Sequence, residues 1–517
     1  MKVLLQRKLS LVVLIVQLLV SVALCWVAFY VEFIPVKYVV AVIAVCAVLL
    51  LYQFLSQMTK SSYIIGRVLC VFFCLFFLGG GYYMYDTYAA VGEIGGAETK
   101  IDIISFYVLK DDKAQSIKDA RDYTFGILQV QDRENTDTAM AEARTEAGQE
   151  LKVEEYTDTA TLVDALYAKE VQVAVFNQAF LDSVKEQYST FEQDTRELVK
   201  HEIKTMMEQE DFNTDVTTKP FNVYISGVDV YGDISTTSRS DVNIIATVNP
   251  VTKKILLTTT PRDYYVPLYG KNGRSVSGGM RDKLTHAGIY GVDCSVNTLE
   301  KLYDIDIDYY VRVNFTSLRK IVDLLGGVEV YSDYDFISDW GPNGAGTHYK
   351  FKKGYNKVNG KKALAFTRER HHFGNGDYQR GRNHQHMIEA LLNKVMSPSV
   401  LKDFSGLLKE SKKMFQTSMS TKKIISLCRM QLNDMAQWKI SYANAEGTGS
   451  KQYTYSMPST SLYVCIPDMD SVQKISRRIK KVMAETEEDV EKDSSDSSED
   501  SEETGEATAT PAAQTEE

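Results

Sequence analysis

Cysteine is scarce in this chain, with seven residues in 517. Four of them stand in long apolar runs, and the other three are irregularly spaced: Cys25, Cys46, Cys70 and Cys74, then Cys294, Cys428 and Cys465. No CxxC pair is present. The sequence therefore excludes a disulfide framework and a cysteine-based metal site, so the core must hold the outer part of the chain together.

Several motifs of common enzyme classes are also missing. Histidines cluster at positions 371, 372, 384 and 386, but no HExxH pattern accompanies them, so we do not predict a zinc site. The Gly-rich loops lack a GxxxxGK[ST] pattern, which argues against a P-loop nucleotide site. The short basic segments near the N-terminus show no helix-turn-helix, so nucleic-acid binding is not expected.

The acidic balance comes from one end of the chain. Residues 485–517 hold fourteen Asp or Glu and only Lys492, a net charge of -13, so the formal charge of -10 leaves about +3 for the rest. A segment this polar and charged cannot bury enough apolar surface to order itself. We predict a disordered acidic tail over residues 484–517.

Three apolar runs in the first 90 residues are each about long enough for a helix to cross a membrane. They cover Leu9–Val31, Val36–Leu55 and Ile64–Tyr85. A cleaved signal peptide is a poorer interpretation of the first run, because that run is long and a second one follows at once. We predict a cytoplasmic N-terminus over residues 1–8 and three transmembrane helices within 9–88.

The basic residues around these runs predict the orientation. Lys2, Arg7 and Lys8 precede the first run, Lys60 and Arg67 separate the second from the third, and only Lys37 lies in the other connection. Basic residues favour the cytoplasmic side, so the N-terminus is expected inside. After three crossings the remainder of the chain is expected outside the cell, attached to the cell membrane.

The outer part divides into two predicted units. Residues 98–212 alternate short apolar runs with polar helical stretches, which indicates a small α/β accessory domain without a catalytic constellation. From Pro220 onward, FNVYISGVDV, SDVNIIATVNP and KKILLTTTP read as strands, CSVNTLEKLYD and FTSLRKIVDLLGG as helices, and a long helix follows over Gln379–Met396. We predict an α/β/α layered domain with a central mixed sheet over residues 219–483.

Two carboxylates follow or begin successive predicted strands in the second unit. Asp229 follows YISGV, and Asp241 begins the next strand with Arg239 two residues before it. Two such carboxylates facing one cleft suit Mg²⁺, which takes one or two protein carboxylates together with phosphate oxygens. Plain turn residues are the alternative, because Asp favours turns.

Arginines gather after two of the predicted strands. Arg262 follows TTTP, and FTRERHHFGNGDYQRGRNHQH contains four more arginines and an aspartate: Arg368, Arg370, Arg380, Arg382 and Asp377. We read KALAFTRER as a strand, so the i, i+2 spacing places Arg368 and Arg370 on one face. Arginines around one cleft suit a phosphate-rich anion, because each guanidinium donates two parallel hydrogen bonds. An exposed charged strand face is the alternative.

These residues resemble the LytR-CpsA-Psr family. The resemblance rests on NVYISGVDVYGD, SRSDVNIIATVNP, LLTTTPRDYYVPL, GGVEVY and TRERHHFGNGDYQRGRN. It implies an extracellular, Mg²⁺-dependent phosphotransferase. Such an enzyme takes capsular polysaccharide or a similar glycopolymer from undecaprenyl pyrophosphate and joins it to peptidoglycan through a phosphodiester.

The resemblance also implies roles for individual residues. Asp229 and Asp241 are the expected Mg²⁺ ligands, and Asp241 is expected to act in catalysis with four arginines: Arg262, Arg368, Arg370 and Arg380. The same arginines are expected to bind the pyrophosphate, together with Arg239, Asp377, Gln379 and Arg382. His384 stands where the family pattern leads us to expect a glutamine, with Gln385 next to it. The IVDLLGGV and MIEALLNKVM runs are expected to line an apolar tunnel for the polyprenyl chain.

Other functions stay open at this point. One is a membrane-bound regulator or attenuator of transcription, which the handful of basic residues near the N-terminus supports poorly because membrane orientation already explains them. Another is a non-catalytic protein that captures a lipid-linked glycan through the same arginines. A hydrolase that passes the glycan to water differs from the transferase only in its acceptor.

Overall fold

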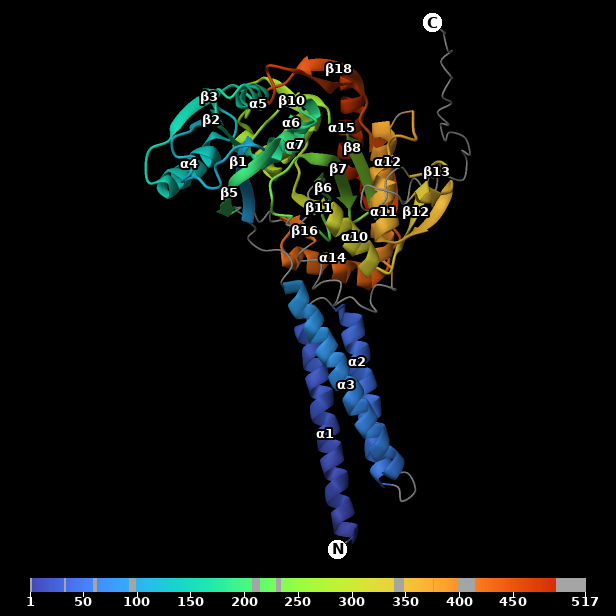
Figure 1. Ribbon diagram of the computed structural model, residues 1–517. Coiled ribbons are helices and arrows are strands. Elements are labelled where there is room, and N and C mark those ends of the chain that lie inside the picture. Colours follow the sequence, from blue (N-terminus) through green and yellow to red (C-terminus); the bar gives the residue numbers. More distant parts are fainter. Residues whose placement is uncertain are drawn as a thin grey trace, which may run out of the picture.

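The structure is a computed structural model in which three long helices carry a larger folded part (Figure 1). It describes residues 2–31, 34–58, 63–92, 99–206, 214–228, 234–338, 348–374, 376–397 and 414–489. Within these ranges the chain has mixed α/β architecture, as predicted. The predicted acidic tail starts too early at residue 484, because Ala484 is the last residue of a helix and Glu485 Oε2 lies 2.8 Å from Lys254 Nζ. The tail beyond residue 489 lies outside the described part.

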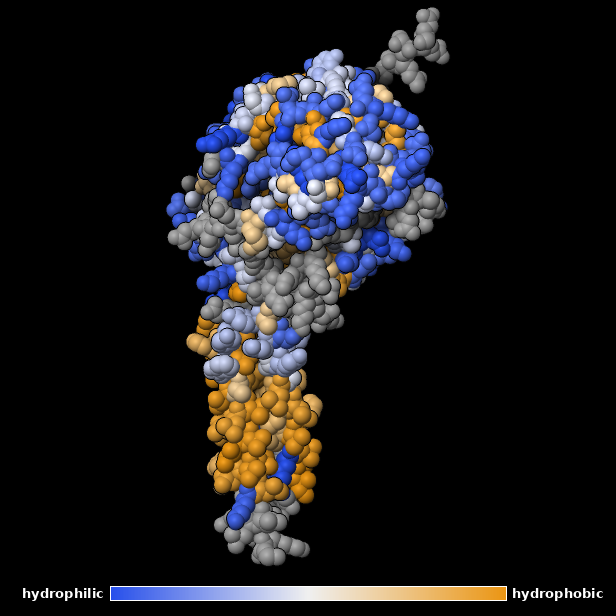
Figure 2. Space-filling model, turned by 60° about the vertical axis from the view of Figure 1, so that its left-hand side comes forward, coloured by the Kyte–Doolittle hydropathy of each residue, from blue (hydrophilic) through white to orange (hydrophobic). Residues whose placement is uncertain are grey.

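The three apolar runs form helices α1 (Lys2–Tyr30), α2 (Val36–Met58) and α3 (Tyr63–Gly92). Each helix is long and apolar enough to cross a membrane, which confirms the prediction of three such helices. They pack through a small cluster centred on Leu24, Cys46 and Phe77. Their outward faces form an apolar band (Figure 2), as expected for helices whose solvent is hydrocarbon.

Helix α14 (Thr421–Asp434) crosses the base of the folded part, next to the ends of the apolar helices (Figure 1). The start of α2 contacts its last turn: Tyr38 Oη donates to the Leu432 carbonyl at 3.3 Å, and Lys37 donates to the Asn433 carbonyl. These contacts join the apolar helices to the domain above them.

The accessory domain contains one five-stranded sheet in the order β3-β2-β4-β1-β5. Its strands are β1 (Thr99–Leu109), β2 (Thr124–Leu128), β3 (Lys152–Tyr156), β4 (Val173–Asn177) and β5 (Thr195–Met206). Its helices are α4 (Arg133–Ala147), α5 (Thr159–Tyr167), α6 (Leu181–Gln187) and α7 (Phe191–Asp194), with the 3-10 turn η1 (Gln178–Phe180). Two closed apolar cores cover this sheet, one including Phe106 and Phe125 and the other Phe176 and Phe191.

The second domain is built on a six-stranded mixed sheet in the order β16-β11-β6-β7-β8-β17. The strands are β6 (Phe221–Val228), β7 (Ser240–Asn249), β8 (Lys254–Thr260), β11 (Tyr309–Asn314), β16 (Phe415–Thr417) and β17 (Lys439–Asn444). Strands β6 and β11 run parallel, as do β8 and β17, and the other neighbours are antiparallel. Strand β6 starts directly after Pro220 and β8 stops directly before Pro261, as predicted.

Helices cover both faces of this sheet, which confirms the predicted α/β/α layers. On one face, α9 (Val292–Tyr303) and α15 (Met469–Ala484) close a core that contains Leu299 and Ile475. On the other face lie α10 (Phe315–Leu324), α11 (Gly360–Arg368), α12 (Gly376–Val395) and α14. Shorter elements surround these layers: β9 (Tyr265–Pro267), η2 (Lys271–Gly273), β10 (Arg281–Lys283), α8 (Leu284–Ala287), η3 (Gly288–Tyr290), β12 (Val328–Ser332), β13 (Phe336–Ile337), β14 (Lys350–Phe351), β15 (Gly354–Val358), β18 (Gly447–Tyr453) and β19 (Ser461–Pro467).

Local signals explain the ends of α10. Asn314 caps its start by accepting a hydrogen bond from the Ser317 amide at 2.9 Å. Beyond its end, Gly326 and Gly327 have φ angles of 71° and 89°, a region that glycine adopts readily.

The prediction of a strand at KALAFTRER is wrong. Asn359 accepts from the Lys362 amide at 3.0 Å and starts helix α11, whose last residue is Arg368. The helix buries Ala363, Leu364 and Phe366, and this burial outweighs the alternating charges that favoured a strand. Arg368 and Arg370 therefore stand at and just beyond a helix end.

Candidate active site

A cavity of about 360 Å³ lies between the second sheet and the helices α10 and α12. Its walls are of two kinds. Five arginines and two carboxylates gather at one part of the wall: Arg239, Arg262, Arg368, Arg370, Arg380, Asp241 and Glu186. The remainder is mainly apolar: Ile225, Val228, Val242, Val313, Phe315, Leu318, Ile321, Met387, Ile388 and Leu391. The cavity therefore suits a ligand with an anionic group joined to an apolar chain.

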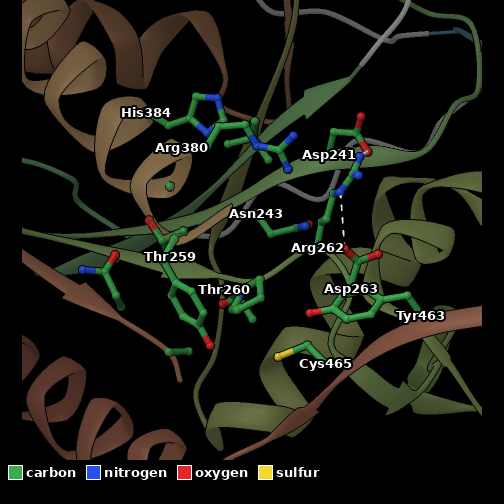
Figure 3. A pocket seen from close by; sticks show the side chains of 16 residues that line it. Asp241, Asn243, Thr259, Thr260, Arg262, Asp263, Arg380, His384, Tyr463 and Cys465 are labelled. Atoms are coloured by element: carbon green, nitrogen blue, oxygen red, sulfur yellow. Dashed lines mark hydrogen bonds and ion pairs between the residues drawn. The ribbon is translucent and has the colours of Figure 1, made fainter. Parts of the chain in front are cut away.

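Helix α12 contributes to both kinds of wall. Arg380 and His384 stand one turn apart, and Met387, Ile388 and Leu391 continue the same stripe along the helix. Figure 3 shows Arg380 and His384 projecting from the helix toward Asp241 and Arg262, which come from the sheet side.

Asp241 is the carboxylate among the arginines. Its Oδ1 accepts from Arg262 Nη1 at 3.1 Å and from the Thr285 hydroxyl at 3.1 Å. Burial alone would raise the pKa of Asp241, but the charges of Arg262, Arg239 and Arg380 outweigh burial and lower it. Asp241 is therefore ionised at neutral pH.

Arg262 is held by a carboxylate on each side. Besides the bond to Asp241, its Nε lies 3.5 Å from Asp263 Oδ2, as drawn in Figure 3. Asp263 in turn lies 3.3 Å from Lys283 Nζ. Because Pro261 ends β8, this arginine extends from the end of a central strand into the cavity.

Arg239 is the most buried arginine of the group, with 8% of its surface exposed. Its Nη1 lies 2.8 Å from Glu186 Oε1, and its Nη2 lies 3.2 Å from Asp182 Oδ2. Both carboxylates belong to α6 of the accessory domain, so this domain contributes a residue, Glu186, to the cavity wall. Sequence reasoning missed Glu186 and Thr285, because no motif marks either residue.

Arg368 is the last residue of helix α11, and Arg370 lies two residues beyond it. The Arg368 guanidinium stacks over the Phe315 ring at 4.5 Å. Glu369 is fully buried, and its Oε1 accepts from the backbone amides of Arg370, His371 and His372 at 2.9 to 3.3 Å. This carboxylate fixes the turn that places Arg370 in the wall.

His384 and Gln385 have different positions. His384 lines the cavity, and burial, followed by the Arg380 charge, lowers its pKa to about 3, so its imidazole is neutral. Gln385 is buried against the sheet instead, where its Nε2 donates to the carbonyls of Leu257 and Ala443 at 3.0 Å each. At the position where we expected a glutamine, the residue facing the cavity is thus a neutral histidine.

Some predicted site residues are not in the cavity wall. Arg382 is exposed, and Gln379 is buried elsewhere, donating to Asp333 at 2.8 Å and to Asn383 at 3.1 Å. Asp229 and the side chain of Asp377 lie outside the described residues. Of the predicted residues, the structure brings together six: Arg239, Asp241, Arg262, Arg368, Arg370 and Arg380.

A second, smaller cavity of about 60 Å³ adjoins the first and shares Asp241, Arg262, Arg380 and His384 with it. The remainder of its wall contains neutral polar residues, a second carboxylate, and apolar or aromatic residues: Asn243, Thr259, Thr260, Asn444, Asp263, Pro261, Tyr378, Gly381, Ala445, Tyr463 and Cys465. Thr259 and Asn444 are paired in register on β8 and β17. Within the described ranges, Thr259 Oγ1 and Asn444 Oδ1 are shielded from solvent and have no hydrogen-bond partner. These two unpaired polar atoms suit a ligand that carries hydroxyl groups.

The donor set is compatible with a magnesium ion. Asp241 is ionised, faces the cavity and stands beside arginines that would gather phosphate oxygens, and Mg²⁺ prefers this mixture of oxygens. The described residues contain no group of three or more His, Cys, Asp or Glu that could hold a metal ion by itself. An ion here would therefore depend on oxygens from the ligand and from water.

A family model matches the second domain together with the last part of the accessory domain. The sequence model of the LytR_cpsA_psr family matches residues 179–496, more than half of the chain. A polyisoprenyl-teichoic acid–peptidoglycan teichoic acid transferase, TagU of Bacillus licheniformis, is 37% identical over 192 residues, which cover 37% of this chain and 57% of that protein. TagU of Enterococcus faecalis is 30% identical over 231 residues, which cover 44% of this chain and 68% of that protein.

The chain spans 57% and 63% of the lengths of TagU from B. licheniformis and from Bacillus subtilis. Two crystal structures from B. subtilis also align. TagV is 26% identical with a TM-score of 0.42, and TagU is 29% identical with a TM-score of 0.40. Each alignment covers 52% of this chain and 99% of the solved chain.

Proposed function

The chain belongs to the LytR_cpsA_psr family, and from this premise we propose that it transfers a glycopolymer from a polyprenyl pyrophosphate carrier to peptidoglycan. The transfer forms a phosphodiester, and a capsular polysaccharide or a similar polymer is the proposed cargo. The TagU relatives, named as transferases of polyisoprenyl-linked teichoic acid to peptidoglycan, support this class of reaction.

The observation that carries the proposal is the two-part wall of the larger cavity. Five arginines and two carboxylates leave a net charge of 5 - 2 = +3 at one part, and the remaining wall is mainly apolar. A low-dielectric pocket with this excess of positive charge favours a polyanion. A soluble sugar phosphate would leave the apolar wall uncovered, whereas a polyprenyl pyrophosphate covers both parts.

The chain's own residues would act mainly by positioning and charge neutralisation. Arg262, Arg370 and Arg380 would hold the pyrophosphate oxygens, with Arg368 and Arg239 beside them. A hydroxyl of the wall acceptor would attack the phosphorus on the glycan side, and the bond to the lipid phosphate would break. The charge that develops on the departing phosphate is then stabilised by arginines already fixed in place.

Asp241, with Asp229 as the family implies, would hold Mg²⁺. A bound Mg²⁺ would neutralise pyrophosphate charge beside the arginines. The smaller cavity, which Asp241 also lines, would take a sugar ring on the glycan side. Its volume of about 60 Å³ corresponds to roughly four to six water molecules, which a sugar ring would displace.

The proposal also includes the outward orientation of the second domain, which the distribution of basic residues around α1–α3 supports. Protease applied to intact cells tests it. Cleavage of the folded part from outside is the expected result, and complete protection would contradict it.

The test of the activity uses the full-length protein in lipid nanodiscs with a polyprenyl-pyrophosphate-linked oligosaccharide, peptidoglycan fragments and Mg²⁺. Formation of a phosphodiester-linked product is followed by mass spectrometry. We expect Arg370→Ala to abolish it, and Arg274→Ala, an exposed arginine of the same domain, to leave it unchanged.

Three outcomes separate the alternatives. Lipid binding without transfer of the glycan to peptidoglycan or to water would identify a carrier protein. Product released only into water would identify a hydrolase. Equal activity of Arg370→Ala and Arg274→Ala would contradict the proposed site.

A further inference from the structure

A chain of opposite charges runs from the accessory domain to the centre of the arginine cluster. Arg239 lies between the α6 carboxylates Asp182 and Glu186, at 3.2 and 2.8 Å. Glu186 Oε2 also lies 3.8 Å from Lys283 Nζ, and Lys283 continues to Asp263 and so to Arg262. The accessory domain is thus in electrostatic contact with two of the five cavity arginines.

These contacts engage Arg239 before any ligand arrives. One terminal nitrogen of its guanidinium faces Asp182 and the other faces Glu186. The two N–H groups that point at these carboxylates must leave them before they can bind a phosphate. The Nε–H group, which is buried without a hydrogen-bond partner, and the second N–H of each terminal nitrogen are not engaged by these two carboxylates. Glu186 also stands in the cavity wall, where its negative charge opposes a polyanion.

The accessory domain is anchored by contacts that do not involve these carboxylates. Ile101 and the segment before β7 exchange backbone hydrogen bonds: the Ile101 amide donates to Ser235 at 2.9 Å, and the Thr237 amide donates to Ile101 at 2.8 Å. The Ser459 amide donates to Asp158 at 2.9 Å, and Gln131 Nε2 donates to the Tyr455 carbonyl at 2.9 Å. Helix α6 is therefore presented to the cavity from a docked domain, and the loss of one carboxylate leaves that docking in place.

We propose that Asp182 and Glu186 are positioning residues of the pyrophosphate site, which hold Arg239 in place and compete with the incoming pyrophosphate for its hydrogen-bond donors. This inference rests on the proposed function, and it gives the accessory domain a role in setting affinity and turnover. The carboxylates keep the cavity from binding pyrophosphate too tightly. They also hold Arg239, and through Lys283 and Asp263 they help to hold Arg262, in the geometry used for transfer.

The test substitutions are Glu186→Gln and Asp182→Asn, which keep side-chain size and remove the charge. Glu192→Gln on α7 is the matched control, because Glu192 is an exposed carboxylate outside the cavity wall. Its partner Lys185, at 3.4 Å, also lies 3.1 Å from Asp182, so the substitution removes a charge from the same cluster and leaves both contacts of Arg239 in place. Affinity for a sugar-free polyprenyl pyrophosphate is measured on the full-length protein. The kcat and KM of glycan transfer are measured in parallel, and melting temperatures confirm folding.

We expect Glu186→Gln to bind the lipid pyrophosphate about three- to tenfold more tightly, because one unit of opposing charge is removed at short range. Its kcat should fall while its KM does not rise, and Glu186→Asp should restore part of the kcat. Asp182→Asn should change both quantities in the same direction but less, and Glu192→Gln should match the wild type. A purely structural role would lower the kcat without tightening binding.

Unchanged or weaker binding in Glu186→Gln, relative to Glu192→Gln, would overturn the inference. The affinity measurement does not need turnover, so it still tests the inference if the wild type binds lipid without transferring glycan. A wild type that fails to bind polyprenyl pyrophosphate would overturn the proposed function and the inference together.

Discussion

The faces of the two sheets in this protein are packed differently. The five-stranded accessory sheet is covered on both faces by closed apolar cores, whose members Phe106, Phe125, Phe176 and Phe191 are fully buried. The six-stranded sheet has a closed core on one face, whereas on its other face the covering helices leave the cavity of about 360 Å³ beside a second core. Both domains are α/β layers, so fold class alone does not separate the domain with a site from the domain without one.

The difference lies in the charged residues on the face that contains the cavity. In the accessory domain, Arg196 is used internally, because its Nη2 donates to the carbonyls of Asp112 and Ala114. In the second domain, five arginines face one cavity that contains only two carboxylates. The comparison teaches that function is indicated here by unbalanced charge beside an unfilled apolar space.

Replacing one arginine in each domain by alanine should give the largest difference in transfer rate between two variants. Arg262→Ala should lower the rate of glycan transfer by on the order of 100-fold or more, because it removes a fixed charge from the proposed site of phosphoryl transfer. Arg196→Ala should lower the melting temperature while leaving the transfer rate per folded molecule nearly unchanged. A similar loss of specific activity in both variants would erase the distinction between the two domains.

Deleting an aromatic ring from each domain tests the closed core against the open wall. Phe106→Ala should destabilise the protein by about 3–5 kcal/mol, because a ring leaves a fully packed core. Phe315→Ala should cost about 1–2 kcal/mol, since this ring already borders a cavity, and should weaken lipid binding instead. Chemical denaturation and lipid titration measure the two effects. Equal destabilisation would show that the Phe315 site is closed.

The pKa values of two aspartates, one in each domain, are shifted in opposite directions. Burial, and next the Asp102 charge, raises the pKa of Asp132 to about 6, whereas the arginines lower the pKa of Asp241. Ionisation of Asp132 therefore lowers the stability of the folded state as pH rises from about 4 to about 6, by on the order of 3 kcal/mol in total. Asp241 contributes stability above its ordinary pKa, and this contribution is lost as pH falls through its lowered pKa.

Asp132→Asn should accordingly remove the decline above pH 4 and raise the melting temperature at pH 8 more than at pH 4. Asparagine also tolerates the left-handed backbone of this position, where φ is 51°. A variant whose melting temperature shifts equally at both pH values would show that the Asp132 charge is not the cause.

The smallest expected effect concerns Arg382. Because this residue is exposed on α12 and outside the cavity wall, Arg382→Ala should change the transfer rate by less than about threefold, close to the value for Arg274→Ala. Kinetics on the two variants side by side provide the measurement. A loss of transfer rate as large as that of Arg370→Ala would show that Arg382 belongs to the proposed pyrophosphate site.

Much of the scaffold was predictable because it depends on local pattern. The three apolar helices, the strands bounded by Pro220 and Pro261, and the glycines after α10 all follow from signals within a few residues. The strand at KALAFTRER was wrong because alternating charges resemble a strand, while the deciding cap at Asn359 and the buried face of α11 were underrated.

The site was predictable only in part. Family resemblance identified six residues that meet in the cavity, including Arg239 and Arg380, which are far apart in the sequence. No sequence pattern indicated that Glu186 reaches the cavity from another domain, because such a contact depends on how two domains dock. The Mg²⁺ pairing of Asp229 with Asp241 remains a prediction.

Helix α12 has a consequence for tolerance to insertion. It carries Arg380 near one end of the cavity stripe and Leu391 near the other, eleven residues apart and thus separated by roughly 16 Å along its axis. Inserting a single residue between His384 and Met387 would rotate the following side chains by about 100° and turn Met387, Ile388 and Leu391 out of the wall. Helix α12 therefore fixes both the distance and the relative orientation between the charged part and the apolar part of the cavity wall, so an insertion or deletion within it would change both.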